Sequence, residues 1–232
     1  MDLLKLQNGS DIRGVALEGI PGEDVTLTAA AMEAIAGGFI RWLRARFPAG
    51  EALRIAVGRD SRLSGPILSR VLCEALCRAG AEVADLGLAA TPAMFMATVL
   101  PRRPYTAAVM LTASHLPWNR NGLKFFTAQG GAESRDIREI LTLAAEPFPA
   151  AEAPGALKKS RFMDTYAAHL RRKITVAAGR PAPLAGLKIV VDAGNGAGGF
   201  FVKKVLQPLG ADTTGSRFLT PDGRFPNHVP NP

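Results

Sequence analysis

The chain has 232 residues, of which 47% are hydrophobic and 21% charged, and its 28 Lys and Arg exceed its 20 Asp and Glu to give a formal net charge of +8. This balance excludes an intrinsically disordered chain and predicts a soluble globular protein of one or two domains. No stretch approaches the ~20 apolar residues of a membrane helix, so we expect no membrane segment. The positive charge favours a phosphate-rich partner, either a sugar phosphate or a nucleic acid.

Strand and helix patterns alternate along the first 150 residues. A short strand carries residues 11–13, and Thr28 begins a helix that runs to about Phe47 because its apolar residues recur three and four apart. Apolar runs then predict strands at 53–58, 82–86, 107–111 and 122–126, and helices at 64–80, 91–100 and 134–145. The short connections between them predict an α/β fold in which helices sandwich a mostly parallel, mixed sheet.

A proline-rich segment follows this first unit. Residues 146–155 contain three prolines in ten positions, which is typical of a linker. We therefore expect one domain in residues 1–150 and a second unit in residues 151–232. Apolar patterns in the second unit predict a helix at 162–173, a strand at 187–191 and a helix at 198–209. The second unit is expected to be the beginning of a similar α/β domain.

The two cysteines point to a cellular compartment. Cys73 and Cys77 lie four residues apart on one face of a predicted helix, whose N-cap we expect to be Ser64. Their spacing is neither Cys-x-x-Cys nor part of a paired metal motif, so we expect small apolar packing residues. Residues 1–8 lack the apolar core of a secretory signal. Both observations favour the reducing cytoplasm.

The residues with the most chemistry follow the strand at 107–111. This strand is expected to be buried and parallel, so the next residues should emerge at its carboxyl end, where open α/β sheets bind ligands. A hydroxyl, an imidazole, a guanidinium and an ammonium fall there within eleven residues, at Ser114, His115, Arg120 and Lys124. A serine becomes nucleophilic when a neighbouring base takes its proton and positive charge gathers the phosphate. We expect this loop to handle phosphate.

Four motifs, in order, resemble those of the α-D-phosphohexomutases, the phosphoglucomutase and phosphomannomutase group. They are Gly9-Ser10-Asp11-Ile12-Arg13-Gly14, Gly58-Arg59-Asp60-Ser61-Arg62-Leu63-Ser64, Thr112-Ala113-Ser114-His115 with Asn121-Gly122-Leu123-Lys124-Phe125, and Val191-Asp192-Ala193-Gly194-Asn195-Gly196. These motifs correspond to the first domain of the family and the opening of its second. The resemblance implies an intramolecular phosphotransferase that interconverts hexose 1-phosphate and 6-phosphate through a phosphoserine and a bisphosphate.

The resemblance also implies roles for single residues. Ser114 would carry the phosphoryl group, His115 and Lys124 would move its proton and orient the phosphate, and Arg13 would stabilise the phosphate in transfer. These groups suit phosphoryl transfer, which depends mainly on positioning and charge neutralisation. The substrate is expected to be a sugar phosphate, with a hexose bisphosphate as activator. Many relatives have asparagine at the position of Leu116, which we interpret as a subfamily difference.

Three charged residues near the second motif have two interpretations. Arg59, Asp60 and Arg62 either support the serine loop and present a cation to phosphate, or pair with one another and cap the helix that follows. We favour the capping role because helix starts commonly collect such residues. Arg59 is nevertheless kept, with Asn121, as a candidate for phosphate binding.

The magnesium site of the family is incomplete here. Its Asp-Gly-Asp-Gly-Asp-Arg loop, which holds Mg²⁺ against the serine phosphate, is absent from the sequence, as are its sugar-selecting third domain and phosphate-gripping fourth domain. Ser114, through its phosphate, is the one metal contact that these residues would supply. We therefore expect an amino-terminal part of a phosphohexomutase, with little or no turnover by itself.

Two other functions are kept as alternatives. Residues 194–199, Gly-Asn-Gly-Ala-Gly-Gly, match the G-x-G-x-x-G turn of dinucleotide-binding domains, and Asp212 lies near the position of a ribose-binding acid. An NAD(P)-binding dehydrogenase domain is therefore one alternative, although Asp192 would lie close to the pyrophosphate. A non-catalytic phosphosugar-binding module is the other. The basic clusters 158–161 and 171–173 lack interleaved aromatic residues, so we expect no nucleic-acid partner.

Overall fold

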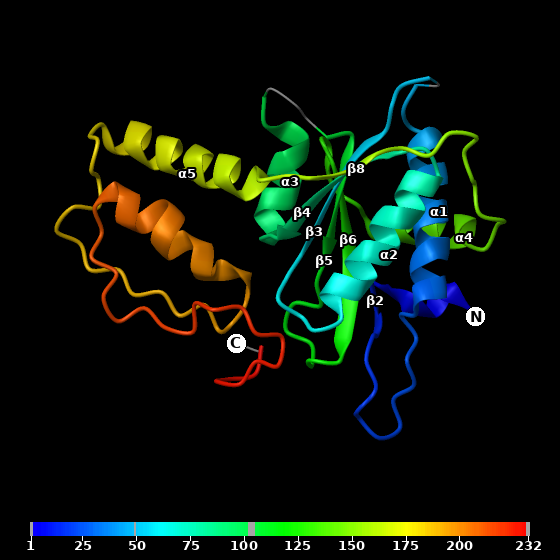
Figure 1. Ribbon diagram of the computed structural model, residues 1–232, viewed down its shortest axis with the longest axis horizontal. Coiled ribbons are helices and arrows are strands. Elements are labelled where there is room, and N and C mark those ends of the chain that lie inside the picture. The colour runs from blue at the N-terminus through cyan, green and yellow to red at the C-terminus, as the bar shows by residue number, and fades with distance from the viewer. Residues whose placement is uncertain (1, 49, 102–104, 231–232) are drawn as a thin grey trace.

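The computed structural model describes residues 2–48, 50–101 and 105–230, and its main feature is one mixed eight-stranded sheet (Figure 1). The strands are β1 (Gln7–Asn8), β2 (Asp11–Val15), β3 (Arg54–Arg59), β4 (Glu82–Leu88), β5 (Ala107–Leu111), β6 (Arg120–Thr127), β7 (Gly130–Gly131) and β8 (Leu157–Lys159). The α-helices are α1 (Ala29–Arg44), α2 (Gly65–Arg78), α3 (Thr91–Val99), α4 (Ser134–Leu143) and α5 (Phe162–Ala178). A short 3-10 helix, Leu3–Leu6, precedes β1.

The sheet has a parallel half and an antiparallel half. The strand order is β1-β2-β6-β5-β3-β4-β8, and β7 pairs with β6. Strands β5, β3, β4 and β8 are parallel, whereas β1, β2 and β6 join through antiparallel pairs. The mixed α/β fold predicted from the alternation of elements is therefore confirmed.

Helices cover both faces of the sheet because the buried strands are apolar on both faces. Ile55 and Val57 face a large core with α1, α2 and α4, while Ala56 faces a smaller core with α3. Figure 1 shows α3 on the opposite side of the sheet from α1, α2 and α4. Small residues on the α3 face let this helix approach the strands closely, and Phe39 packs on Phe125 in the larger core at 4.6 Å between ring centroids.

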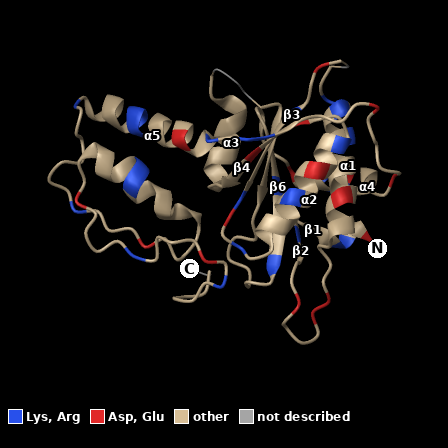
Figure 2. Cartoon of the chain, viewed as in Figure 1, with Lys and Arg blue, Asp and Glu red and all other residues tan. Residues whose placement is uncertain are grey.

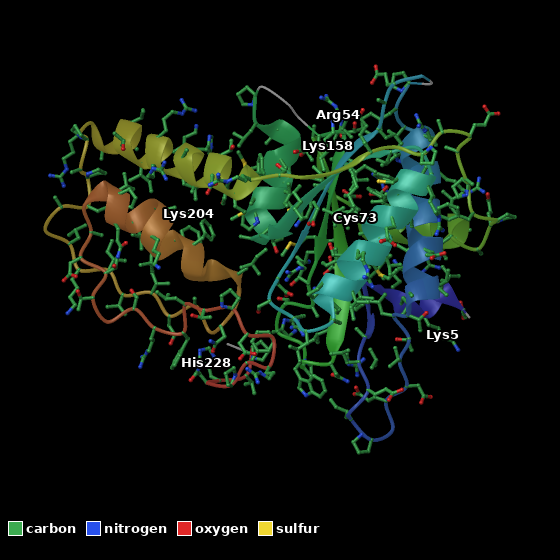
Figure 3. The ribbon with its side chains drawn as sticks, in the orientation of Figure 1. Lys5, Arg54, Cys73, Lys158, Lys204 and His228 are labelled. Atoms are coloured by element: carbon green, nitrogen blue, oxygen red, sulfur yellow. The ribbon has the colours of Figure 1, made fainter. Side chains whose placement is uncertain are left out.

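The two cysteines belong to this larger core. Cys73, labelled on α2 in Figure 3, is 2% exposed, and Cys77 is 9% exposed; both are free thiols. Burial raises the pKa of the Cys73 thiol to about 12, so it remains protonated and unreactive. The predicted packing role of both cysteines is confirmed.

The predicted linker is bound to the first unit along its length. Ala151 N donates to Arg78 O at 2.9 Å, and Gly155 N donates to Cys77 O at 2.8 Å. The chain then forms β8, which pairs in parallel with β4 and lies beyond residue 150. Strand β8 is not predictable from the sequence pattern, because its three residues are all exposed and show no alternation.

The second unit is less regular than the sequence predicts. In place of a strand at 187–191 there are two isolated parallel pairs, Lys188 with Asp212 and Asp192 with Arg217. The helix predicted at 198–209 is a run of tight and wide turns: 3-10 at Ala197–Gly199, π at Val202–Leu206 and 3-10 at Gln207–Leu209. This run packs against α5 around three buried residues, Ala167, Val205 and Leu209.

Figure 2 shows basic and acidic residues distributed over the helices and loops of both units. Lys158, Lys159, Arg172 and Lys173 of the basic clusters are exposed, as predicted for solvated faces. Within the described residues, no helix combines the length and apolar character needed to cross a membrane.

Candidate active site

Ser114 occupies a tight turn directly after β5. Its backbone has φ 54°, a left-handed conformation that is uncommon for residues other than glycine, and its side chain is exposed. The Ser114 N–H donates to Thr112 Oγ1 at 3.2 Å, and Leu116 N donates to Ala113 O at 3.1 Å. The turn therefore presents the Ser114 hydroxyl to solvent at the carboxyl edge of the sheet, as the sequence predicts.

A single buried arginine holds the loop that follows Ser114. Arg62 is 0% exposed, and its guanidinium donates to four backbone carbonyls of the serine loop. Nη1 donates to Pro117 O at 2.6 Å and Arg120 O at 3.0 Å, and Nη2 donates to Ser114 O and Leu116 O, both at 2.8 Å. A planar guanidinium can satisfy several carbonyls at fixed angles, so Arg62 determines the course of the loop.

Asp60 links the same arginine to the serine turn. Its Oδ2 lies 3.3 Å from Arg62 Nε and accepts a hydrogen bond from Thr112 Oγ1 at 2.7 Å. Burial lowers the pKa of the Arg62 guanidinium and the Asp60 carboxylate opposes that shift, so the group stays charged. The pairing of Asp60 with Arg62 that we favoured is present, but the two residues support the serine loop and do not cap α2.

A compact cluster of charges lies on the strands beside the loop. The β2–β6 register sets Arg13 opposite Gly122, whose carbonyl accepts from Thr112 N at 3.0 Å. Asp11, which is 8% exposed, contacts Arg13 Nη2 at 2.7 Å and Lys124 Nζ at 2.6 Å. Arg13 Nη1 is buried and has no hydrogen-bond partner in the described part of the chain. A buried donor of this kind is available for an anionic oxygen.

Asp11 is a site residue that the sequence analysis did not single out. Its signal was present, because side chains two apart on a strand share one face, and Asp11 and Arg13 are two apart on β2. The partner Lys124 lies 113 residues further along the chain, so only the strand register shows that one carboxylate serves both cations.

The other predicted residues divide into exposed and buried ones. His115 is exposed beside Ser114, and Arg59 ends β3 in register with Leu111, donating to Asp60 O at 3.2 Å. Asn121 is 0% exposed, its Nδ2 donates to Ser64 Oγ at 2.9 Å, and its Oδ1 accepts from Gly122 N. Both ends of this amide are used within the fold. Ser64 is the N-cap residue of α2, as predicted, but its hydroxyl accepts from Asn121 and makes no capping hydrogen bond.

The second unit closes one side of the site. A cavity of about 410 Å³ is lined by Ser114 and Asp60 from the first unit and by Asp192, Gly194 and His228 from the second. His228, labelled in Figure 3, lies with Nε2 3.3 Å from Asp192 Oδ1, and this contact raises the pKa of the imidazole. The Gly194 N–H and His228 lower the pKa of Asp192.

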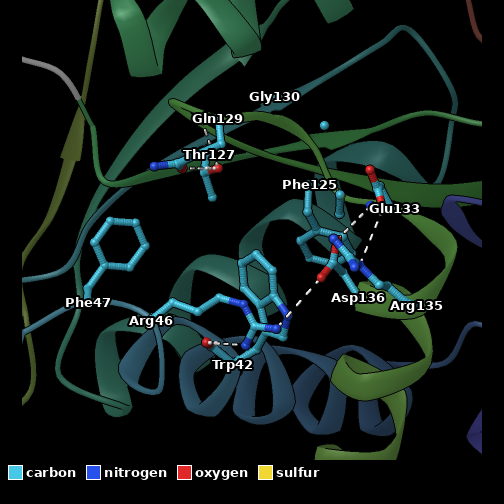
Figure 4. Close-up of a pocket in the computed structure, with 12 residues that line it drawn as sticks. Trp42, Arg46, Phe47, Phe125, Thr127, Gln129, Gly130, Glu133, Arg135 and Asp136 are labelled. Atoms are coloured by element: carbon cyan, nitrogen blue, oxygen red, sulfur yellow. Dashed lines mark hydrogen bonds and ion pairs between the residues drawn. The ribbon is translucent and has the colours of Figure 1, made fainter.

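A different pocket lies at the far end of β6 (Figure 4). It has a volume of about 380 Å³ and is lined by Trp42, Phe125, Thr127 and the start of α4. Arg46, which stacks on Trp42, pairs with Glu139 at 2.6 Å, so the cation is neutralised there. None of the predicted site residues lines this pocket, because β6 begins at the serine loop and ends here.

The residues present do not fit a magnesium site by themselves. Across residues 2–48, 50–101 and 105–230, no group of three or more His, Cys, Asp or Glu side chains is arranged to hold a metal ion. The carboxylates around the site, Asp11, Asp60 and Asp192, are already engaged by basic side chains.

The fold and the site together define a mixed α/β domain that carries an exposed serine on an arginine-held loop. The family model described as phosphoglucomutase/phosphomannomutase, alpha/beta/alpha domain I, matches residues 4–147, and the model for domain II matches residues 164–232. The chain belongs to the phosphoglucomutase/phosphomannomutase family, the α-D-phosphohexomutases.

Individual relatives agree with this assignment. The chain is 36% identical over 181 residues to a phosphomannomutase/phosphoglucomutase of Pseudomonas putida, covering 77% of this chain and 36% of the relative. It is 34% identical over 218 residues to a phosphoglucosamine mutase of Frankia casuarinae, covering 90% and 45%. The crystal structure of a phosphoglucomutase/phosphomannomutase family protein from Burkholderia thailandensis superposes with a TM-score of 0.80 at 30% identity, covering 99% of this chain and 47% of that one.

The chain thus spans less than half the length of these relatives. The comparisons do not favour the dinucleotide-binding alternative, because the glycine turn at 194–199 lies inside the match to domain II of the mutase family.

Proposed function

We propose that the chain is the phosphoserine-bearing part of an enzyme that interconverts hexose 1-phosphate and hexose 6-phosphate through a bisphosphate. The observation that carries this proposal is the geometry at Ser114. Its exposed hydroxyl stands on a left-handed turn held by Arg62, and the partly buried cations Arg13 and Lys124 lie on the adjoining strands. A fixed nucleophile beside fixed positive charge is what phosphoryl transfer requires of a protein.

The charges suggest a division of labour between the neighbours of Ser114. Lys124 is bound by both oxygens of Asp11 at 2.8 and 2.6 Å, which suits it to neutralising phosphoryl charge as an ammonium. His115, exposed and adjacent, is then the group that takes the hydroxyl proton. Arg13 Nη1, a buried donor with no hydrogen-bond partner in the part of the chain that the structure describes, would bind a phosphoryl oxygen.

Phosphorylated Ser114 first gives its phosphoryl group to the free hydroxyl of a hexose monophosphate: the bond between phosphorus and Ser114 Oγ breaks as the bond to the sugar oxygen forms, and the sugar hydroxyl proton passes through His115 to Ser114 Oγ. In the second step Ser114 Oγ takes the other phosphoryl group of the bisphosphate. The bond between that phosphorus and its sugar oxygen breaks, and the serine proton passes through His115 to the sugar oxygen. Arg59, at the end of β3, is proposed to bind a phosphate oxygen. The buried Asn121 would contribute by keeping β6 in place.

Mg²⁺, when bound in the complete enzyme, would neutralise charge on the phosphoryl group. The present residues would contribute Ser114 through its phosphate, and the aspartates of the family are not among them. We therefore infer that these 232 residues alone show little or no turnover. A hexose bisphosphate is the proposed activator, because it can load Ser114 with phosphate.

The chain is proposed to contain one complete domain and part of a second. The matches to residues 4–147 and 164–232 support a division near residue 150, with domain I in 1–150 and part of domain II in 151–232. The substrate is proposed to be a sugar phosphate in the cytoplasm, without a nucleic-acid or membrane partner. The solvated positions of Lys158, Lys159, Arg172 and Lys173 support this interpretation of the basic clusters.

The test uses the product of the whole coding sequence, read beyond the codon for Pro232. Mass spectrometric mapping of protein isolated from its own cells is expected to find phosphate on Ser114. A coupled assay is expected to show hexose phosphate interconversion that Ser114→Ala abolishes and Ser160→Ala leaves unchanged. Activity retained by Ser114→Ala would contradict the proposal. Isomerisation by the purified 232-residue chain would contradict the inference that it needs the remaining domains.

A further inference from the structure

A turn of the second unit rests directly on the backbone that carries Arg62. At Gly223 there is no room for a side chain, because a Cβ would collide with the carbonyl oxygen of Ser61 and lie 2.5 Å from Leu63 N and 2.8 Å from Arg62 C. Backbone therefore touches backbone between residues 222–225 and 61–63. This contact joins the two units at the residue that holds the serine loop.

The same turn covers the Arg62 side chain. The ring centroid of Phe225 lies 5.5 Å from Arg62 Cζ, within the range of a cation–π contact. Phe225 has φ 50°, a strained conformation for a bulky residue that persists only where its surroundings determine it. Phe225 N donates to Asp222 O at 3.0 Å, and Asp222 Oδ1 accepts from Arg224 N at 3.0 Å. These bonds fix the turn that places the ring.

Asn195 anchors this turn within the second unit. Its backbone carbonyl accepts from Asp222 N at 2.8 Å, its Nδ2 donates to Thr220 O at 2.9 Å, and its Oδ1 accepts from Asn227 at 2.6 Å. Asn195 itself is 7% exposed, and its partners Thr220 and Asn227 lie at the surface. The glycine turn at 194–199, which resembles a dinucleotide-binding motif, therefore binds residues 220–227 of the same chain through Asn195.

From these contacts we propose that Arg62 is a positioning residue for Ser114, and that the seating of the 222–225 turn sets the position of Arg62. The chain of contacts is continuous: Asn195 holds the turn, the turn holds Arg62, and Arg62 holds the carbonyls of residues 114–120. With the turn displaced, water reaches the guanidinium and competes for those carbonyls. The order of the serine loop is thus coupled to the contact between the two units.

The importance of this coupling for catalysis rests on the proposed function, but the coupling can be measured without activity. Hydrogen–deuterium exchange of the 232-residue chain, followed by peptide mass spectrometry, reports the order of residues 113–122. Gly223→Ala is expected to speed exchange there roughly tenfold or more, because charged hydrogen bonds of this kind are lost. Gly198→Ala is the matched control, since a Cβ there meets nothing closer than Ala193 Cβ at 3.9 Å.

Substitutions of the arginine complete the test. Arg62→Met is expected to give the same faster exchange as Gly223→Ala, Arg62→Lys a smaller increase, and the exposed control Arg70→Met none. In the complete enzyme, Gly223→Ala is expected to lower kcat with little change in KM.

Exchange in residues 113–122 that stays at the level of the unsubstituted chain in Gly223→Ala would overturn the proposal. The same conclusion would follow if the second unit opened, shown by fast exchange in residues 197–209, while the serine loop stayed protected. Faster loop exchange in a chain whose Ser114 never carries phosphate would leave the positioning role intact and refute the proposed function alone.

Discussion

Two turns of the molecule have the same backbone conformation and use it differently. Ser114 follows β5 with φ 54°, and Asn195 follows the bridged segment at Asp192 with φ 60°. Ser114 is exposed, and its hydroxyl has no hydrogen-bond partner among the described residues. Asn195 is 7% exposed, and its side chain binds Thr220 and Asn227. The Ser114 turn is stabilised by hydrogen bonds from the distant Arg62 to its backbone. The Asn195 turn is stabilised by hydrogen bonds of the Asn195 side chain.

The difference shows what a reactive side chain needs from its surroundings. A left-handed residue costs free energy wherever it occurs, so some contact must stabilise it. If its own side chain supplies that contact, the side chain is unavailable for chemistry. Arg62 supplies the contact for Ser114, which leaves the hydroxyl available.

The largest expected effect is the loss of phosphoryl uptake when Ser114 is replaced. Ser114→Ala is expected to abolish phosphoryl uptake by the complete enzyme while changing the free energy of unfolding by no more than about 0.5 kcal/mol, because the side chain is exposed. Intact-mass measurement after incubation with a hexose bisphosphate, together with urea unfolding, checks both. A substantial loss of stability would show that the hydroxyl holds the turn, as the Asn195 amide does.

Asn195→Ala, in contrast, is expected to lower the stability of the fold. It removes the two side-chain hydrogen bonds of a buried amide whose partners, Thr220 and Asn227, are exposed, so we expect a loss of about 1–2 kcal/mol in the free energy of unfolding. Asn195→Gly is the control, because it removes the same bonds but relieves the left-handed strain. Urea unfolding of both variants separates the two contributions. A loss below ~0.5 kcal/mol would remove the distinction between the turns.

Near each turn a carboxylate contacts two basic side chains, and the two carboxylates differ in how deeply they are buried. Asp11 lies at 11% side-chain exposure between Arg13 and Lys124, whereas Asp192 lies at 37% between Arg217 and His228. Asp11→Asn is expected to cost about 1–3 kcal/mol because it leaves two partly buried cations underpaired. Asp192→Asn is the matched control and is expected to cost less. Equal losses in urea unfolding would show that burial does not matter here.

The smallest expected effect is a titration. The hydrogen bond with Asp192 raises the pKa of His228, so this contact stabilises the fold fully below about pH 6.5 while Asp192 stays ionised, and the stabilisation is lost as pH rises through the raised pKa. A proton NMR titration is expected to place His228 above about 6.5, and Asp192→Asn to bring it down toward that value. His169, whose pKa burial lowers, is the internal control. An unshifted His228 would refute the pairing.

The sequence predicted the elements of the first unit because they depend on local spacing. The strand at residues 107–111 has the predicted bounds, and Thr28 caps α1 by accepting from Ala31 N at 3.2 Å. The cores that these elements form follow from the apolar period. The prediction failed where the pattern is weak, as in the exposed β8. At Ser64 the N-cap position was predictable, but its bonding partner Asn121 was not, because a distant segment supplies it.

The candidate site was predictable as a set of residues, but its contacts were not. Ser114, His115 and Lys124 stand out because their chemistry is concentrated in one loop. The partners that give the site its geometry lie far away in sequence: Arg62 is 52 residues from Ser114, and Asp11 is 113 residues from Lys124. The glycines at 194–196 were ambiguous for a related reason, since a glycine pattern specifies a backbone turn and not the groups that fill it.

The short strand β8 covers an edge of the sheet that could otherwise pair with another molecule. It pairs with β4, and the preceding segment is bonded along the end of α2, so β4 is not the outermost strand. A chain cut at residue 150 would leave the amides and carbonyls of β4 open to another molecule, a common route to edge-to-edge aggregation. Three residues with two lysines, unremarkable in the sequence, thus serve as a guard strand that protects the sheet from self-association.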